Sequence, residues 1–156
     1  MEVSFTMVSI AGAGVIALFI ILRLIRFLKK RNERPVPLEE MEGHEFEYFC
    51  AQLLERRGFE EVEVTKGSGD YGIDILAEKD GVTYAVQCKR YTAPVGVKAI
   101  QEAYAGKDYY DRMVGAVMTN QYFTAPAVEA AKKLKILLWD GGYLEEMISE
   151  DSQKSF

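Results

Sequence analysis

The sequence predicts an α/β domain with a mixed β-sheet flanked by helices, preceded by one transmembrane helix. Two strand patterns joined by a short turn lie in the middle of the chain, and strand and helix patterns alternate after them. A hairpin followed by helical crossovers implies both antiparallel and parallel neighbours in one sheet. A long uncharged run at the start of the chain predicts the membrane helix.

The uncharged run extends over the 20 residues from Val3 to Leu22. A helix of this length spans about 30 Å, the thickness of the hydrocarbon core of a bilayer. Five basic residues follow it: Arg23, Arg26, Lys29, Lys30 and Arg31. A cleaved signal peptide would carry them before the run, so cleavage is disfavoured, and a buried soluble helix is the other alternative. The positive-inside rule predicts a single-pass protein of the cell membrane, with the N-terminus outside and the following domain in the cytoplasm.

Small residues recur every fourth position within the uncharged run, at Ser9, Ala13 and Ala17. This pattern is compatible with a homo-oligomer but is common in single membrane helices.

Charge and composition divide the chain into unlike parts. The segments we expect are a membrane helix with its basic flank (1–31), a linker containing Pro35 and Pro37 (32–40), a folded domain (41–149) and a tail (150–156). Residues 1–31 carry net charge +4, and residues 32–156 carry −9. The 49% hydrophobic content is that of a chain with a core, which excludes a disordered or fibrous protein.

In the first half of the folded domain, the sequence predicts a helix and three strands. Apolar residues recur at helical spacing within 41–57, and Gly58 suits the residue just past a helix end. Residues 62–65 alternate as a short strand. Two further strands, 73–78 and 82–89, flank the turn residues Lys79, Asp80 and Gly81 and predict a hairpin.

The second half predicts alternating helices and strands. The expected helices are 94–110, 125–134 and 143–148, with Pro94 at the first start and Thr124 as the cap of the second. The expected strands are 113–118 and 136–139.

Several common catalytic sites are disfavoured. Cys50 and Cys88 stand alone without a CxxC pair, and His44 has no second histidine with which to share a metal. Neither phosphate-binding glycine motif of nucleotide enzymes is present. Zinc sites, histidine-based nucleophiles and nucleotide loops therefore lack the residues they need.

Polar residues in the hairpin are the remaining candidates for chemistry. Asp74 lies in an apolar run, and alternation sends Gln87 and Lys89 to the same side of the next strand. One interpretation is structural, with a cross-strand ion pair between Asp74 and Lys89 and with Gln87 bonded to a backbone group. The other is functional, with Asp74 and the Gln87 amide oxygen binding a divalent cation and Lys89 orienting a water for attack on a phosphodiester. Spacing alone leaves both open.

The surrounding motifs resemble the Mrr-type restriction endonuclease domain, a branch of the PD-(D/E)-X-K nuclease superfamily. The matching segments are GDYGIDILA at 69–77, VQCKRY at 86–91, PVG at 94–96, FE at 46–47, LL at 53–54, GF at 58–59 and VMTN at 117–120. The likeness covers roughly residues 40 to 148 and implies a restriction-endonuclease-like mixed sheet flanked by helices.

The resemblance also implies roles for individual residues. Asp74 matches the metal-binding aspartate, Lys89 the catalytic lysine, and Gln87 the second acidic position, where an amide is similar to what the Mrr branch shows. Glu47 matches a helix glutamate that could restore the missing negative charge at the metal, and Gln101 matches another recurrent polar position, on the helix after the lysine strand. Asp70 is an alternative ligand, although a turn residue is the simpler interpretation.

The function implied is metal-assisted hydrolysis of DNA. Mg²⁺, or another divalent cation such as Mn²⁺, would polarise the phosphate while Lys89 positions the nucleophile. A net charge of −9 gives no general attraction to DNA, so binding would depend on local basic residues such as Lys66, Arg90 and Lys98. We expect a membrane-anchored endonuclease concerned with restriction or DNA defence. The alternatives are an inactive nuclease-fold module that tethers DNA or a protein to the membrane, and a purely structural membrane adaptor.

Overall fold

The computed structural model describes residues 21, 37–38, 40–66 and 71–154. The predicted membrane span, apart from Ile21, and its basic flank lie outside these residues, as does Asp70. No helix within the described ranges is long and apolar enough to cross a membrane. Residues Pro37–Phe156 form one compact unit, which contains every element described below.

A mixed β-sheet forms the centre of this unit. Its strands are β1 (Glu60–Val64), β2 (Ile75–Lys79), β3 (Val82–Lys89), β4 (Val114–Thr119) and β5 (Ile136–Trp139). They lie side by side in this order; β1, β2 and β3 are antiparallel neighbours, whereas β4 runs parallel to β3 and β5 runs parallel to β4. The predicted mixed sheet is therefore confirmed.

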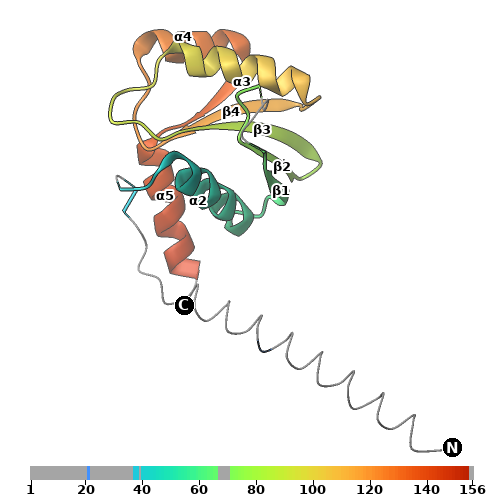
Figure 1. Cartoon of the computed structure of the whole chain (residues 1–156), viewed down its shortest axis with the longest axis vertical. Coiled ribbons are helices and arrows are strands. Elements are labelled where there is room, and N and C mark those ends of the chain that lie inside the picture. Colours follow the sequence, from blue (N-terminus) through green and yellow to red (C-terminus); the bar gives the residue numbers. More distant parts are fainter. Residues whose placement is uncertain (1–20, 22–36, 39, 67–70, 155–156) are drawn as a thin grey trace, which may run out of the picture. The chain divides into compact units, whose positions relative to one another are not determined.

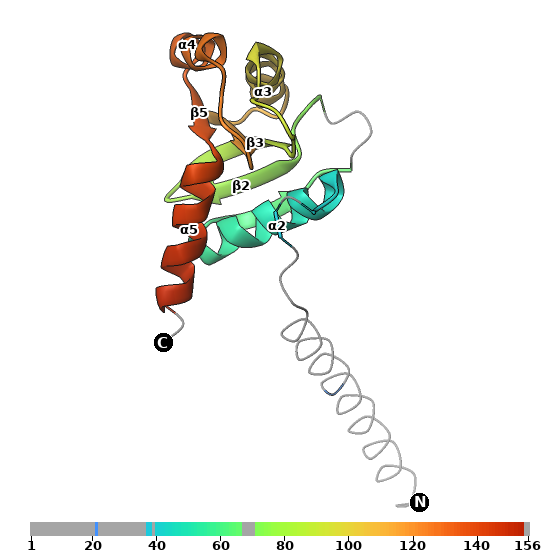
Figure 2. The same ribbon diagram turned by 90° about the vertical axis from the view of Figure 1, so that its left-hand side faces the viewer.

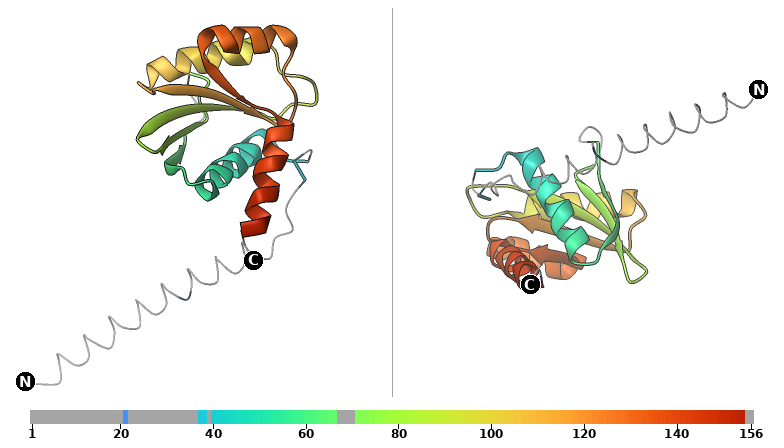
Figure 3. Two further views of the ribbon diagram at one scale, coloured as in Figure 1. Left: turned by 180° about the vertical axis from the view of Figure 1, so that it is seen from behind. Right: turned by 90° about the horizontal axis from the view of Figure 1, so that it is seen from below.

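Two pairs of helices cover the two faces of the sheet. The helices are α2 (Gly43–Arg56), α3 (Val97–Tyr109), α4 (Ala125–Leu134) and α5 (Gly141–Lys154). Helices α3 and α4 lie on one face and α2 and α5 on the other (Figure 1), as the view turned by 90° also shows (Figure 2). Seen from below, α2 and α5 lie in front of the sheet (Figure 3).

The hairpin between β2 and β3 forms as the sequence predicts. Asp80 and Gly81 both adopt positive φ angles, 53° and 75°. Two consecutive residues of this kind make the turn whose twist suits a two-residue hairpin, and Asp-Gly favours it. Lys79 and Val82 are consequently cross-strand partners, which sets the register of the whole hairpin.

Most predicted boundaries are displaced in the structure. Helix α3 begins at Val97 rather than at Pro94, because the backbone of Val95 bonds Tyr122 and Thr124 instead of joining the helix. Two further displacements have a local cause. Strand β2 begins at Ile75 rather than at residue 73, because the Asp74 carboxylate accepts a hydrogen bond from the backbone of β3. Helix α5 begins at Gly141 and continues to Lys154, into the expected tail. No proline interrupts residues 141–154, and the Asp140 carboxylate accepts a hydrogen bond from the Tyr143 N–H at the start of the helix.

The alternation of side chains along β3 and β4 divides the core into two clusters. Val86, Cys88, Ala116 and Met118 pack against α2 and α5. The cluster on the opposite face contains Val117 with residues of α3, α4 and β5. Gln87 lies between Val86 and Cys88 in the chain, so its side chain faces α3, on the side opposite to theirs.

Candidate active site

Gln87 and Lys89 converge on one side chain of α3, that of Glu102. The Gln87 Nε2 donates to the Glu102 Oε2 at 2.8 Å, and the Lys89 Nζ lies 3.1 Å from the same oxygen. Gln87 is only 1% exposed, although its side chain is polar. Lys89 thus pairs with a helix residue that the sequence reasoning did not single out, and Gln87 bonds a side chain rather than a backbone group.

Glu102 is held as an anion by its neighbours. Partial burial raises the pKa of its carboxyl, but hydrogen bonds from Gln87 and Lys89 and the charges of Lys89 and Lys98 outweigh burial and hold the pKa below its ordinary value. The Lys98 Nζ lies 3.6 Å from Oε1, one helical turn away. The carboxylate is therefore shared among two ammonium groups and one amide.

A signal for Glu102 exists in the sequence, in the small residues of its helix. Ala99 and Gly106 are buried, and they lie three residues before and four residues after Glu102, on the same ridge of α3. A Cβ at Gly106 would overlap the Ile73 side chain, so the helix approaches the sheet very closely here. A glutamate on this ridge reaches the sheet, whereas the side chain of the adjacent Gln101 is exposed.

Asp74 lies at the end of the hairpin, next to the backbone that separates Gln87 from Lys89. Its Oδ2 accepts a hydrogen bond of 2.6 Å from the Cys88 N–H, and its own N–H donates to the Val86 carbonyl at 2.9 Å. On the other side, the Thr65 N–H donates to the Asp74 carbonyl at 2.9 Å. Both neighbouring strands therefore fix the position of the half-buried aspartate.

The end of β3 is fixed by β4. The buried Thr119 hydroxyl donates to the Lys89 carbonyl at 2.6 Å. The Asn120 side chain accepts from the Tyr91 N–H and donates to the Tyr91 carbonyl, each at 2.9 Å. The chain on both sides of Arg90 is thus anchored, and the position of the lysine does not depend on a free loop.

Glu47 lies on α2, the helix on the other face of the sheet. Its half-buried carboxylate is 2.7 Å from the His44 Nδ1. Cys88, which points to this face, has a pKa raised above its usual value by a hydrogen bond with Cys50, by burial, and by the negative charges of Asp74 and Glu47. Both carboxylates therefore act on the same thiol, and Glu47 lies on the face of the sheet opposite to Glu102.

The candidate DNA-contacting residues differ in exposure. Lys66 is exposed, the Lys98 side chain is 88% exposed, and Arg90 is half-buried. Lys98 lies beside the site through its contact with Glu102.

The oxygen atoms at the site suit a hard divalent cation. The Gln87 Oε1 is buried and has no hydrogen-bond partner among the described residues. The opposite orientation of the amide would place this oxygen against the Glu102 carboxylate, so the network fixes which end points away. An amide oxygen together with the Asp74 carboxylate is a donor set for Mg²⁺, which retains several waters when proteins bind it. Within the described ranges, no three His, Cys, Asp or Glu side chains cluster as a metal site.

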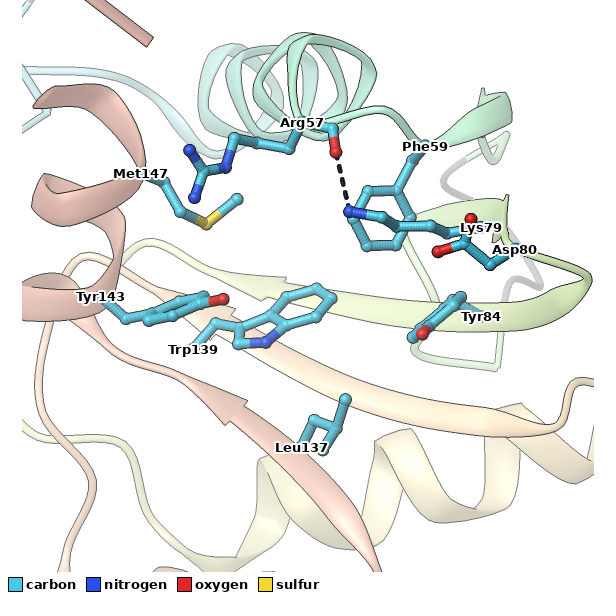
Figure 4. A pocket seen from close by; sticks show the side chains of 9 residues that line it. All are labelled: Arg57, Phe59, Lys79, Asp80, Tyr84, Leu137, Trp139, Tyr143 and Met147. Atoms are coloured by element: carbon cyan, nitrogen blue, oxygen red, sulfur yellow. Dashed lines mark hydrogen bonds between the residues drawn. The ribbon is translucent and has the colours of Figure 1, made fainter. Parts of the chain in front are cut away.

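A separate pocket lies on the α2 and α5 face. Its volume is about 350 Å³, and Figure 4 shows the residues that line it: Arg57, Phe59, Lys79, Asp80, Tyr84, Leu137, Trp139, Tyr143 and Met147. The Lys79 Nζ donates to the Arg57 carbonyl at 2.9 Å and lies 5.0 Å from the centre of the Phe59 ring. None of the site residues predicted from the sequence lines it.

Comparison with solved structures shows which known folds resemble this one. The chain is similar to a "Protein of Unknown Function AF1548", with a TM-score of 0.59 and 26% identity over 68% of this chain and 65% of that one. It is similar to the "DNA modification-dependent restriction endonuclease AspBHI" (TM-score 0.55, 17% identity, 69% of this chain and 31% of that one). It is also similar to MspJI in complex with a 27-mer oligonucleotide (TM-score 0.52, 20% identity, 66% of this chain and 27% of that one). The chain thus spans about a third or less of each of these two endonucleases.

The match to a protein-family model includes every strand of the described sheet. No curated protein matches the chain significantly. The family model Mrr_cat, described as "Restriction endonuclease", matches residues 38–148, which include all five strands and the residues gathered around Gln87. The chain therefore belongs to the Mrr-type restriction endonuclease family and contains a nuclease domain of that fold.

Proposed function

We propose that the protein is a divalent-metal-dependent DNA endonuclease that is anchored in the cell membrane and faces the cytoplasm. The observation that carries the enzymatic part is the buried, unpartnered Gln87 Oε1. Gln87 directly precedes Cys88, whose N–H donates to the Asp74 carboxylate, and lies two residues before Lys89. Orphaned buried oxygens are rare in proteins, and a bound cation accounts for this one. The membership of the restriction endonuclease family directs the proposal to DNA.

Each residue of the site has a role in this proposal. Asp74 and Gln87 would hold Mg²⁺ or Mn²⁺ through a carboxylate and an amide oxygen, and Glu47 would add negative charge from α2. When bound, the ion would supply Lewis-acid chemistry at the scissile phosphate and at a water. Lys89 orients the attacking water and offsets the negative charge that develops on the phosphate. The anchored backbone on each side of Arg90 preserves that orientation.

DNA binding by the domain should be weak and sensitive to salt. The net charge of residues 32–156 is −9, so only local contacts attract phosphates. Lys66, Arg90 and Lys98 are the residues we assign to these contacts. MspJI is a restriction endonuclease whose structure contains an oligonucleotide, which supports DNA as the substrate class.

Plasmid cleavage tests the enzymatic proposal. The purified full chain is incubated with supercoiled plasmid and Mg²⁺, beside Asp74→Ala and beside Glu129→Gln, a matched surface control whose carboxylate pairs with Lys133 on α4. We expect nicking by the wild type and the control, loss of nicking in Asp74→Ala, and loss on chelation. Equal nicking by Asp74→Ala would refute the site. Binding without nicking in any divalent metal would favour the tethering module, which the acidic charge of the domain and the neutralisation of Lys89 by Glu102 also favour.

Deletion of residues 1–31 tests the anchor. We propose that the uncharged run from Val3 to Leu22 spans the bilayer and that its small-residue stripe permits self-association. The full chain should then sediment with membranes and resist extraction by high salt, whereas the deletion variant should remain in the supernatant. Identical fractionation of the two proteins would refute the anchor.

A further inference from the structure

Two side chains of β3 contact the same oxygen atom of Glu102. The Gln87 amide and the Lys89 ammonium both reach its Oε2, at 2.8 and 3.1 Å. An Nε2 that donates to a carboxylate cannot be exchanged for Oε1 without placing two oxygens in repulsive contact. The orientation of the amide is therefore determined by the charge of Glu102.

Gly72 shows that this contact is closely packed. A Cβ at this position would lie 3.1 Å from the Gln87 Nε2 and 3.1 Å from the Glu102 Cβ. The residue also has a φ of +77°, which glycine adopts without strain. The backbone of Gly72 therefore packs against the amide and against α3 at once, and the amide has little room to turn.

We propose that Glu102 is a positioning residue that holds the Gln87 amide with its oxygen toward the cation and supplies, from α3, the negative charge that the neutral amide lacks. Glutamine is then the residue that fits at position 87 because a carboxylate already lies against it. The orientation of the amide stands on its own, whereas the cation-binding half of the inference rests on the proposed function.

A second carboxylate at position 87 would be strongly unfavourable. Gln87 is 1% exposed, and its Nε2 is 2.8 Å from the Glu102 Oε2, so a glutamate would bring two anionic oxygens together out of water. Such a pair either shares a proton or separates, and both outcomes disturb the site. Exchanging the two residue types would restore one amide and one carboxylate with nearly the same shape.

Four full-length proteins test the inference: wild type, Gln87→Glu, Glu102→Gln and the double exchange. Their melting temperatures are first compared without divalent metal. We expect Gln87→Glu to lower Tm by more than about 5 °C, Glu102→Gln by less, and the double exchange to recover most of the loss. Additive losses in the double exchange, or an unchanged Tm in Gln87→Glu, would overturn the orienting role. If Gln87→Glu does not fold alone, its recovery by Glu102→Gln decides the question.

Calorimetric titration with Mg²⁺ tests the second half. Glu102→Gln should weaken binding by about tenfold or more, because it releases a residue that orients a ligand. The double exchange, with a carboxylate at position 87, should bind at least as tightly as the wild type. Glu129→Gln makes the same change in an exposed ion pair and should alter neither quantity.

The two measurements separate two kinds of failure. No Mg²⁺ binding by the wild type would refute the metal part of the proposed function, whereas the melting cycle would still test the orientation of the amide. Unchanged Mg²⁺ affinity in Glu102→Gln, with normal binding by the wild type, would refute the role of Glu102 toward the cation alone.

Discussion

The two faces of strand β3 carry opposite chemistries within four residues. Val86 and Cys88 point to α2 and α5, where they pack in an apolar cluster. Gln87 and Lys89 point to α3, where both bond Glu102. The alternation of side chains along β3 determines which face each residue occupies. The polar side chains can be buried on the α3 face because Glu102 bonds them, since a buried polar group without a partner costs free energy.

The difference between the faces predicts that fold and function can be damaged separately. Loss of a side chain on the apolar face should reduce stability and leave the chemistry of each folded molecule intact. Loss of a side chain on the polar face should do the reverse. Substitutions on each face therefore test whether stability and cleavage depend on separate sides of β3.

Lys89→Ala should have the largest effect, and on cleavage alone. The lysine stabilises charge that develops during hydrolysis, so we expect a loss of at least about 100-fold in nicking rate. Its ion pair with Glu102 is partly exposed, and the free energy of unfolding should fall by no more than about 1 kcal/mol. Single-turnover nicking and urea unfolding measure the two quantities. Full cleavage by this variant would remove Lys89 from the site, and Glu129→Gln provides the control.

Val86→Ala should act on the opposite face and in the opposite way. The side chain is fully buried, and removing two carbons while leaving a partial cavity should lower the free energy of unfolding by about 2 kcal/mol. Nicking per folded molecule should remain close to wild type below the unfolding transition. A large loss of cleavage at unchanged stability would show that the two faces are not independent.

Gly72→Ala should damage both properties to a smaller extent. The φ of +77° strains any other residue by about 1–2 kcal/mol, and the new Cβ would press on Gln87 and Glu102. We expect this loss in urea unfolding together with slower nicking. Gly58→Ala is a matched control for the backbone strain, because Gly58 has a φ of +81° and no atom within 4 Å of an added Cβ. Equal nicking by the two variants would show that the contact with the amide is unimportant.

Local patterns in the sequence predicted the order of the elements, and contacts between distant residues account for what they missed. The Asp-Gly turn and the alternation of β3 are local, so the hairpin and the common side of Gln87 and Lys89 could be predicted. Glu102 was not predicted from the sequence, because its reach depends on how closely Gly106 packs on Ile73. The start of β2 was misplaced because the Asp74 side chain, and not the backbone ladder, bonds Cys88.

The smallest predicted effect concerns Cys88 and the dependence of stability on pH. Its thiol pKa is raised by the hydrogen bond with Cys50, by burial, and by the charges of Asp74 and Glu47, so the native state keeps the proton. The unfolded chain releases it near pH 8.5, and stability should therefore be full below that pH and fall as the pH rises above it. The limiting slope for one proton is about 1.4 kcal/mol per pH unit. Urea unfolding from pH 7 to 10 should show a shallower decline in Cys88→Ala than in the wild type, and equal slopes would mean that the apolar face of β3 does not hold the thiol neutral.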